Sequence, residues 1–330
     1  MTQWERPRRL RSSRAMRRLV REFRVDGTSL MQPLFVKEGL VDPVAIDGLP
    51  GVLQHGPDSL LEAVARAHEV GVGAVMIFGV PRDRDATGSG ALHPDSVLAS
   101  SIRSIRQRFD DRIVIAADLC LDEFTSHGHC GVLDRAGRVD NDATLEIYAR
   151  MAVVLAEAGV HLLGTSGMMD GQVGAVRSAL DSADRTDVGI MAYAVKYASA
   201  FYGPFRGAVE SRLEGDRTTY QQDPANFREA MREVRLDVAE GADIIMVKPG
   251  TIYFDVLRKV SEMVDVPTAT YIVSGETAMI EAAAASGSID REAAIDEIIT
   301  SARRAGATII CTYWATEFAR RSSRDSRERR

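Results

Sequence analysis

Eight short apolar runs recur along the chain, and each is followed by a segment with helical periodicity. The runs are continuous rather than alternating, which is typical of strands buried on both faces, as in a parallel sheet. They span residues 30–36, 74–79, 113–120, 161–167, 188–196, 242–250, 267–275 and 307–314. The helical patterns span residues 58–70, 95–109, 142–158, 171–182, 224–240, 254–264, 276–285 and 290–305. This order of elements predicts an α/β protein with a parallel sheet.

Four glycines stand where a helical pattern gives way to the next run: Gly71, Gly159, Gly241 and Gly306. Glycine at such a position supplies the left-handed residue that ends a helix. Eight βα units, several of them with a helix-ending glycine before the next strand, predict a closed (β/α)8 TIM barrel. A doubly wound sheet is the alternative, but no glycine-rich nucleotide loop follows the first run. We expect an N-terminal oligomerisation arm (1–29), a barrel catalytic domain (30–319) and a basic, flexible tail (320–330).

Both ends of the chain are basic, although the formal net charge is −6. Residues 1–24 hold nine arginines and two glutamates. No RNA-binding pattern accompanies them, so we expect the arm to pair with an acidic neighbouring subunit rather than with nucleic acid. No apolar run approaches the roughly 18 residues that span a bilayer. Three cysteines suit a reducing compartment, and we expect a cytoplasmic chain with no membrane partner.

Lysine is rare, since only four of the 41 lysine and arginine residues are lysines. Lys196 and Lys248 end two of the apolar runs. A lysine amine can lose its proton and attack a carbonyl, whereas a guanidinium stays charged. Two such amines favour chemistry on ketones, and an ion-paired lysine at the barrel rim is the alternative. The C-terminal ends of the strands meet at one mouth of a barrel. We therefore expect six further residues at or just after strand ends to lie near the two lysines: Lys37, Asp118, Cys120, Ser166, Ser274 and Tyr313.

The loop at residues 118–131 has the character of a metal site. Cys120 and Asp122 lie two apart on an extended segment and project the same way, and Cys130 can fold back to meet them. Two thiolates and a carboxylate would bind zinc and leave a fourth position open. We expect His129 beside the ligands rather than among them.

A second long connection, at residues 197–224, carries Arg206, Arg217 and Gln221. Guanidinium groups with paired donors suit a substrate carboxylate. The aromatic run at residues 201–205 favours packing within the loop.

Several segments then match, in order, the motifs of one family. They are Asp118-Leu-Cys120, Thr125-Ser-His-Gly-His-Cys-Gly131, Lys196-Tyr-Ala-Ser-Ala-Phe-Tyr-Gly-Pro-Phe-Arg206, Met246-Val-Lys-Pro-Gly250 and Val273-Ser-Gly-Glu276. Further matches are Arg8-Arg-Leu-Arg-Ser12, Val139-Asp-Asn-Asp-Ala-Thr-Leu-Glu146 and Thr312-Tyr313. The chain closely resembles the porphobilinogen synthase (5-aminolevulinate dehydratase) family over nearly its whole length.

The resemblance implies a lyase of haem biosynthesis that condenses two 5-aminolevulinate molecules to porphobilinogen with loss of two waters. It also implies a homo-octamer whose N-terminal arms embrace neighbouring subunits. The implied catalytic residues are Lys248 and Lys196, which form Schiff bases with the two ketones, and Asp118 and Ser166, which assist proton transfer.

The resemblance further implies groups that hold substrates and metals. The carboxylate of the first substrate is assigned to Ser274 and Tyr313, and that of the second to Arg206, Arg217 and Gln221. Zinc on Cys120, Asp122 and Cys130 would orient the second substrate, and Glu233 matches the position of an allosteric magnesium.

Some residues depart from the pattern of the family. Asp122 stands where zinc-dependent members usually have a third cysteine. The other departures are Lys37, Gly167, Gln172, Thr218, Ile272 and Thr277. Two alternatives therefore stay open: a diverged paralogue that makes another product from 5-aminolevulinate or a related amino ketone, and a non-catalytic relative with an assembly role.

Overall fold

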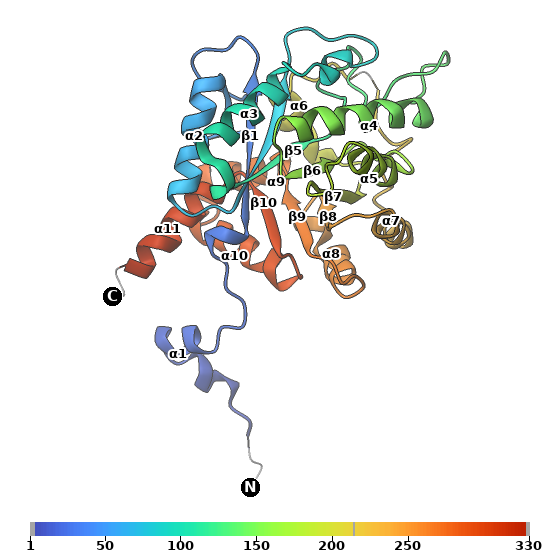
Figure 1. Cartoon of the computed structure of the whole chain (residues 1–330). Coiled ribbons are helices and arrows are strands. Elements are labelled where there is room, and N and C mark those ends of the chain that lie inside the picture. The colour runs from blue at the N-terminus through green and yellow to red at the C-terminus, as the bar shows by residue number, and fades with distance from the viewer. Residues whose placement is uncertain (1–3, 214, 328–330) are drawn as a thin grey trace.

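The computed structural model, which describes residues 4–213 and 215–327, has eight parallel strands closed into a barrel (Figure 1). Each strand pairs with the next one in the barrel, and β10 closes the ring by pairing in parallel with β1. The barrel strands are β1 (Leu30–Lys37), β4 (Ala74–Val80), β5 (Val114–Asp118), β6 (Leu162–Thr165), β7 (Gly189–Lys196), β8 (Ile244–Lys248), β9 (Thr268–Ile272) and β10 (Ile309–Thr312). The predicted TIM barrel is confirmed.

Helices lie around the outside of the barrel, one or more in each connection (Figure 1). Those that the sequence predicts are α2 (Pro57–Glu69), α3 (Val97–Phe109), α4 (Asn141–Glu157), α5 (Gln172–Ser182), α7 (Phe227–Ala239), α8 (Phe254–Ser261), α9 (Ser274–Ala285) and α10 (Arg291–Arg304). The four helix-ending glycines all have left-handed backbone, with φ from 84° at Gly71 to 114° at Gly306. Glycine is needed there because a side chain would be strained at such angles.

Smaller elements decorate the barrel. Strand β3 (Leu53–His55) pairs in parallel with β1, and β2 (Val44–Ala45) pairs antiparallel with β3. Helix α6 (Gly203–Ala208) lies in the connection from β7 to β8. The short 3-10 helices are η1 (Pro7–Arg11), η2 (Gly27–Ser29), η3 (Ser89–Leu92), η4 (Asp110–Arg112), η5 (Ala200–Tyr202) and η6 (Thr251–Tyr253).

The two ends of the chain differ in how they meet the barrel. Helices η1 and α1 (Arg14–Leu19) stand away from it, and neither contains a buried residue (Figure 1). Helix α11 (Ala315–Arg327) instead packs against the barrel, and Arg321 forms ion pairs with Glu292 and Asp296 of α10. The tail expected from residue 320 therefore begins inside this helix, and its residues 328–330 lie outside the described part of the chain. No described helix is both long and apolar enough to cross a membrane.

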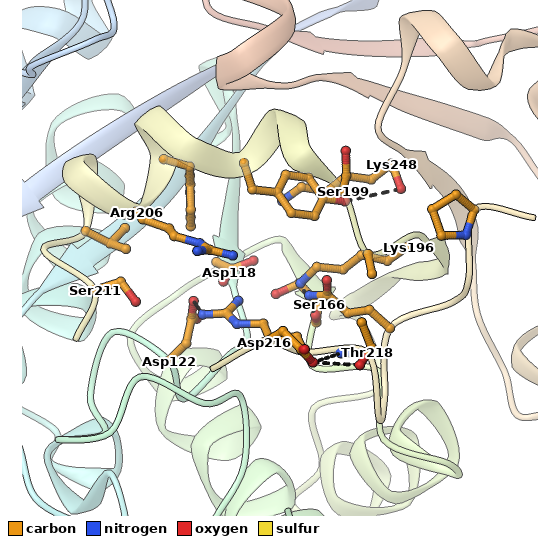
Figure 2. Close-up of a pocket in the computed structure, with 17 residues that line it drawn as sticks. Asp118, Asp122, Ser166, Lys196, Ser199, Arg206, Ser211, Asp216, Thr218 and Lys248 are labelled. Atoms are coloured by element: carbon orange, nitrogen blue, oxygen red, sulfur yellow. Dashed lines mark hydrogen bonds and ion pairs between the residues drawn. The ribbon is translucent and has the colours of Figure 1, made fainter. Parts of the chain in front are cut away.

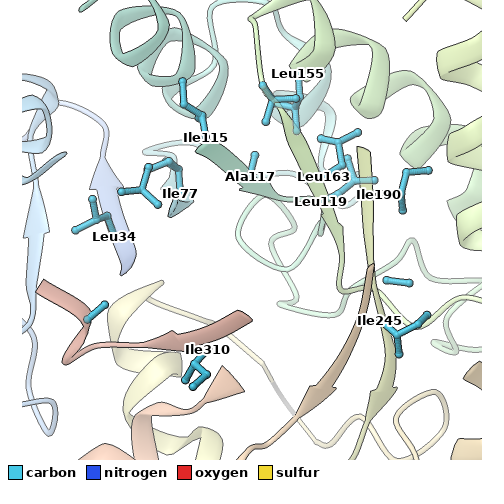
Figure 3. Close-up of a cluster of buried hydrophobic side chains, with 14 of the residues drawn as sticks. Leu34, Ile77, Ile115, Ala117, Leu119, Leu155, Leu163, Ile190, Ile245 and Ile310 are labelled. Carbon is cyan, nitrogen blue, oxygen red and sulfur yellow. The ribbon is translucent and has the colours of Figure 1, made fainter. Parts of the chain in front are cut away.

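Two apolar layers hold the barrel together, and strand residues alternate between them. On β4, Met76 and Phe78 face the interior, whereas Val75 and Ile77 face the surrounding helices. Figure 3 shows part of the outer layer, in which strand residues such as Ile77 and Leu163 belong to one cluster with helix residues such as Leu155. Because both faces of each strand are buried, the runs read as continuous in the sequence.

A bulge in β7 interrupts this alternation. Met191 and Tyr193 face the interior, so strict alternation would turn Lys196 outward. The register between β7 and β8 instead shifts between Ala192 and Val195, and Val195 joins the outer layer. The extra residue returns Lys196 to the inner face at the mouth of the barrel.

The outer layer gives a stability prediction with a matched control. Val75 of β4 is fully buried, whereas Val114 of β5 is 41% exposed. We expect Val75→Ala to lower the free energy of unfolding by about 2 kcal/mol, because it removes buried methyl groups and leaves a cavity. Val114→Ala should change it by less than about 0.5 kcal/mol. Urea unfolding followed by circular dichroism measures both, and equal losses would contradict the assignment of this layer.

Candidate active site

A cavity of about 310 Å³ opens at the mouth formed by the C-terminal ends of the strands (Figure 2). Among the predicted site residues, the carboxyl, hydroxyl and amine groups of the cavity wall come from strand ends and the residues just after them. The arginines come from the connection between β7 and β8. Eight of the predicted site residues line the cavity: Asp118, Asp122, Ser166, Lys196, Arg206, Arg217, Gln221 and Lys248. Thr218, one of the departures from the family pattern, lines it as well.

The two lysines end neighbouring strands at the same level. Lys196 of β7 and Lys248 of β8 are register partners, and they are 4% and 5% exposed. Their Nζ atoms lie 6.0 and 5.3 Å from the centre of the Tyr193 ring, which places both amines about one aromatic side chain. The cavity can therefore present two amines to ligands that share it.

Lys248 is enclosed by aromatic rings. Its Nζ lies 4.6 Å from the ring centre of Tyr271, and the rings of Tyr193, Tyr202 and Phe205 complete the enclosure within 5.4 Å. Burial, followed by the neighbouring charge of Lys196, lowers the pKa of Lys248 to about 8. A pKa near 8 leaves roughly a tenth of the amine neutral at pH 7, against roughly one part in three thousand for an ordinary lysine.

Lys196 has a different environment. Its Nζ donates a hydrogen bond to the carbonyl of Ser166. Burial works against its charge, but negative charge on Cys130 and on Asp122 outweighs burial and raises the pKa of Lys196. The two amines are thus biased toward opposite protonation states in the same cavity.

Asp118 is the first residue of the metal loop and interacts electrostatically with both lysines. It is buried, and one of its carboxylate oxygens has no hydrogen-bond partner among the described residues. Burial, together with repulsion from Asp122, raises the pKa of Asp118 to about 6, although both lysines oppose the shift. A carboxyl group with this pKa can accept and return a proton near neutral pH.

The predicted metal loop forms a compact group of donors. Single donor atoms of Cys120, Asp122 and Cys130 all lie within 4.8 Å of one another, and all three side chains are buried. A hydrogen bond from Cys120 and the charge of Arg217 overcome burial and lower the pKa of Cys130 to about 7. Two thiols and one carboxylate at this spacing fit a zinc ion. His129 is outside the group, and its Nδ1 lies 3.1 Å from the hydroxyl of Tyr220.

Arg217 links the metal loop to the substrate cavity. Its guanidinium donates to Asp122 Oδ2 and to the carbonyl of Gly128, both at 2.8 Å. Both side chains are largely buried, and the attraction of Arg217 overcomes burial and lowers the pKa of Asp122. One residue predicted to hold substrate and one predicted to hold metal therefore form a buried ion pair.

The departures at positions 167 and 172 have a structural counterpart. The hydroxyl of Tyr148 donates to the carbonyl of Cys130 and lies 3.7 Å from the sulfur of Cys120. A Cβ atom at Gly167 would lie 2.2 Å from that hydroxyl and 2.8 Å from the side-chain oxygen of Gln172. Glycine at position 167 thus leaves room for the tyrosine that supports the metal loop.

Two predicted substrate-binding residues are not part of the described cavity wall. The hydroxyl of Ser274 accepts a hydrogen bond from the backbone N–H of Phe205, at 2.9 Å. The hydroxyl of Tyr313 is paired with that of Tyr271 at 3.1 Å. Phe205 itself lines the cavity and also packs on Phe78, with ring centres 5.3 Å apart. The prediction that this aromatic run only packs within its loop is therefore incomplete.

Glu233 lies elsewhere, in a second cavity of about 580 Å³ that it lines with Asp170 and Glu229. Its side chain is partly buried, and burial, followed by repulsion from Asp170 and Glu229, raises the pKa of Glu233. The cavity is acidic and separate from the lysines.

Sequence reasoning missed two residues of the site. Glu123 is buried and groups with Asp118, Cys120 and Asp122, and burial raises its pKa. Tyr193 lies under both amines. Glu123 could have been identified from the sequence, because it is a further acidic residue in the metal loop. Tyr193 could not, because in the sequence it resembles any other core residue of a strand.

The low pKa of Lys248 gives a pH prediction. Only the neutral amine reacts with carbonyl compounds, so the rate of reductive methylation at Lys248 should rise about tenfold per pH unit below 8 and then level off. A lysine in a short peptide should keep gaining reactivity to about pH 10. Formaldehyde with cyanoborohydride, followed by mass spectrometry, measures both. A Lys248 profile that follows the peptide would contradict the shift.

Comparisons with known proteins identify the family of this chain. The family model described as "Delta-aminolevulinic acid dehydratase" matches residues 4–321. Relatives of that name from Streptomyces coelicolor and Mycobacterium tuberculosis are 57% and 55% identical over 317 residues, and each alignment covers 96% of both chains. The crystal structure of the Toxoplasma gondii enzyme in complex with the reaction product porphobilinogen has a TM-score of 0.94 and 42% identity, covering 96% of this chain and 91% of that one. The chain belongs to the delta-aminolevulinic acid dehydratase, or porphobilinogen synthase, family.

Proposed function

We propose that the cavity binds two molecules of 5-aminolevulinate and joins them through Schiff bases on Lys248 and Lys196. Family membership makes the chain a hydro-lyase that forms porphobilinogen with loss of two waters, a step of haem biosynthesis. The observation that carries the Schiff-base assignment is the pair of buried amines on adjacent strand ends. Within the described residues, the neighbours of the Lys248 amine are rings rather than an ion-pair partner.

Each amine would attack the ketone of one substrate and release water as the imine forms. A protonated imine is a stronger electrophile than a ketone, and its enamine is a carbon nucleophile, so the two lysines can activate both partners. Asp118 would move protons between these states, because its pKa of about 6 lies near the working pH. Ser166 is assigned to the same proton transfers, since its backbone already contacts Lys196.

Two separate carboxylate sites would keep the identical substrates in different orientations. Arg206, Arg217 and Gln221 line the cavity and would hold one carboxylate. Ser274 and Tyr313 would hold the other. That assignment requires the loop to move, because neither residue lines the described cavity and the Ser274 hydroxyl donates to the carbonyl of Phe201, at 3.5 Å.

We assign zinc to Cys120, Asp122 and Cys130, with His129 nearby, because buried thiols and a carboxylate converge there. When bound, the dication would neutralise the negative charge that otherwise holds Lys196 protonated. Glu233 in the acidic cavity is the proposed position of a regulatory magnesium.

A homo-octamer built through residues 1–29 belongs to the same proposal. Within this arm, η1 and α1 stand away from the barrel, and Trp4 and Leu19 are 76% and 75% exposed, which a neighbouring subunit would cover. A cytoplasmic location follows from the role in haem biosynthesis.

The first test is incubation with 5-aminolevulinate. We expect a pyrrole that reacts with Ehrlich's reagent, and borohydride should trap substrate on Lys248, Lys196 or both. Lys248→Arg should abolish turnover with the fold intact, since a guanidinium cannot form the imine. Lys259→Arg, at an exposed position on α8, should keep full activity.

Two outcomes would redirect the assignment. A trapped imine without the pyrrole would favour a paralogue that makes another product. The departures from the family pattern at Gly167 and Thr218 are the reason for considering this alternative. Turnover by Lys248→Arg would contradict the Schiff-base role.

The metal assignment has a control within the chain, because all three cysteines are buried. We expect about one zinc per chain in the wild type and in Cys311→Ala, whose thiol is inside the barrel. Cys120→Ser and Cys130→Ser should lose it. Elemental analysis after dialysis measures the content, and equal zinc in all variants would place the metal elsewhere.

A further inference from the structure

Helix α6 carries Arg206 to the cavity, and its C-terminal end is anchored by side chains outside the catalytic site. The carbonyl groups of Ala208, Val209 and Glu210 follow the last turn and accept no backbone hydrogen bond recorded within the described residues. Such terminal carbonyls need partners from elsewhere in the fold. Ala208 and Val209 are fully buried, so water does not serve them.

Two side chains of the barrel rim supply these partners. Arg84, in the connection after β4, donates to the carbonyls of Val209 and Glu210 at 2.8 and 2.7 Å. Gln54 of β3 donates to the carbonyl of Ala208 at 2.8 Å. The planar guanidinium spans two adjacent carbonyls, which a lysine amine cannot match. A cation at a helix C-terminus is also favoured by the helix dipole.

Lys37 adds a weaker contact. Its amine pairs with the carboxylate of Glu210, whose left-handed φ of 52° ends the helix. Both side chains are partly exposed, at 34% and 44%, so the ion pair is screened by water. Arg84 is therefore the main anchor, and Lys37 is accessory to it.

We propose that Arg84 is a positioning residue for substrate binding: it anchors the C-terminal end of α6 and thereby sets where the Arg206 guanidinium stands. This inference rests on the proposed role of Arg206 in holding a substrate carboxylate. The Arg206 side chain is exposed and, among the described residues, has no recorded hydrogen bond or ion pair, so the position of the α6 backbone sets how far it can reach into the cavity. Nearer the N-terminal end of the helix, the backbone N–H of Phe205 donates a hydrogen bond to the hydroxyl of Ser274.

The test combines Arg84→Gln, Arg206→Gln and the double variant in the full-length protein. We expect Arg84→Gln to raise KM for 5-aminolevulinate about tenfold, the loss typical of hydrogen bonds to a charged group, with a smaller change in kcat. In the double variant Arg84→Gln should add nothing, because it acts through Arg206. Arg82→Gln, two residues away on the same loop, is the control and should leave KM unchanged.

Hydrogen exchange measured by mass spectrometry tests the anchor without substrate. The N–H groups of Val209, Glu210 and Ser211 are bonded within this turn. They should exchange faster in Arg84→Gln and at an intermediate rate in Arg84→Lys, which keeps the charge but not the paired donors. Thermal unfolding close to that of the wild type would show that the change is local.

The outcomes separate the two proposals. If Arg206→Gln raises KM but Arg84→Gln does not, or if their effects simply add, the positioning role is wrong. If Arg206→Gln leaves KM unchanged, the carboxylate assignment fails, and with it the consequence proposed for Arg84. Unchanged exchange at residues 209–211 in Arg84→Gln would overturn the anchor itself.

Discussion

Desolvation at the mouth of the barrel is the constraint on which the site depends. Burying an ammonium ion is costly unless it is paired, and a group in that position shifts its pKa instead. Lys248 lies among aromatic rings that attract a cation without accepting its proton, and its pKa falls to about 8. Lys196 sits at the edge of the thiol and carboxylate cluster, and its pKa rises. Opposite surroundings thus distinguish two lysines at the same level of adjacent strands.

The negative cluster beside Lys196 in turn depends on one ion pair. Asp122 would be costly to bury as a lone anion, and Arg217 offsets that cost with a direct contact at 2.8 Å. The same guanidinium is proposed to receive a substrate carboxylate. The proposed binding of metal at Asp122 and that of substrate at Arg217 are therefore expected to be coupled, because each uses one member of the same ion pair. A third cysteine in place of Asp122 would lack the carboxylate that makes this contact.

The barrel was predictable from sequence because its cause is local. Continuous apolar strands repeat in every unit and glycines end four of the helices, and the structure places Gly71 and Gly306 in the left-handed region. The strand-end rule also brought Lys248 and Asp118 to one cavity. The inward direction of Lys196, however, depends on a bulge that alternation does not reveal. Long-range pairs such as Arg217 with Asp122, 95 residues apart, leave no mark in either local sequence.

The departures from the family pattern at positions 167 and 172 are explained better together than one at a time. Gly167 is beside Ser166, whose carbonyl holds Lys196, and the space that a larger residue would fill contains the Tyr148 hydroxyl. That hydroxyl supports the carbonyl of Cys130, and the Gln172 amide donates to the carbonyl of Leu119 in the same loop, at 3.4 Å. Neutral hydrogen bonds here fix the metal loop without adding charge to a cluster already rich in acids and thiols. Changing position 167 alone would force Tyr148 away from the loop, so these positions are expected to vary together.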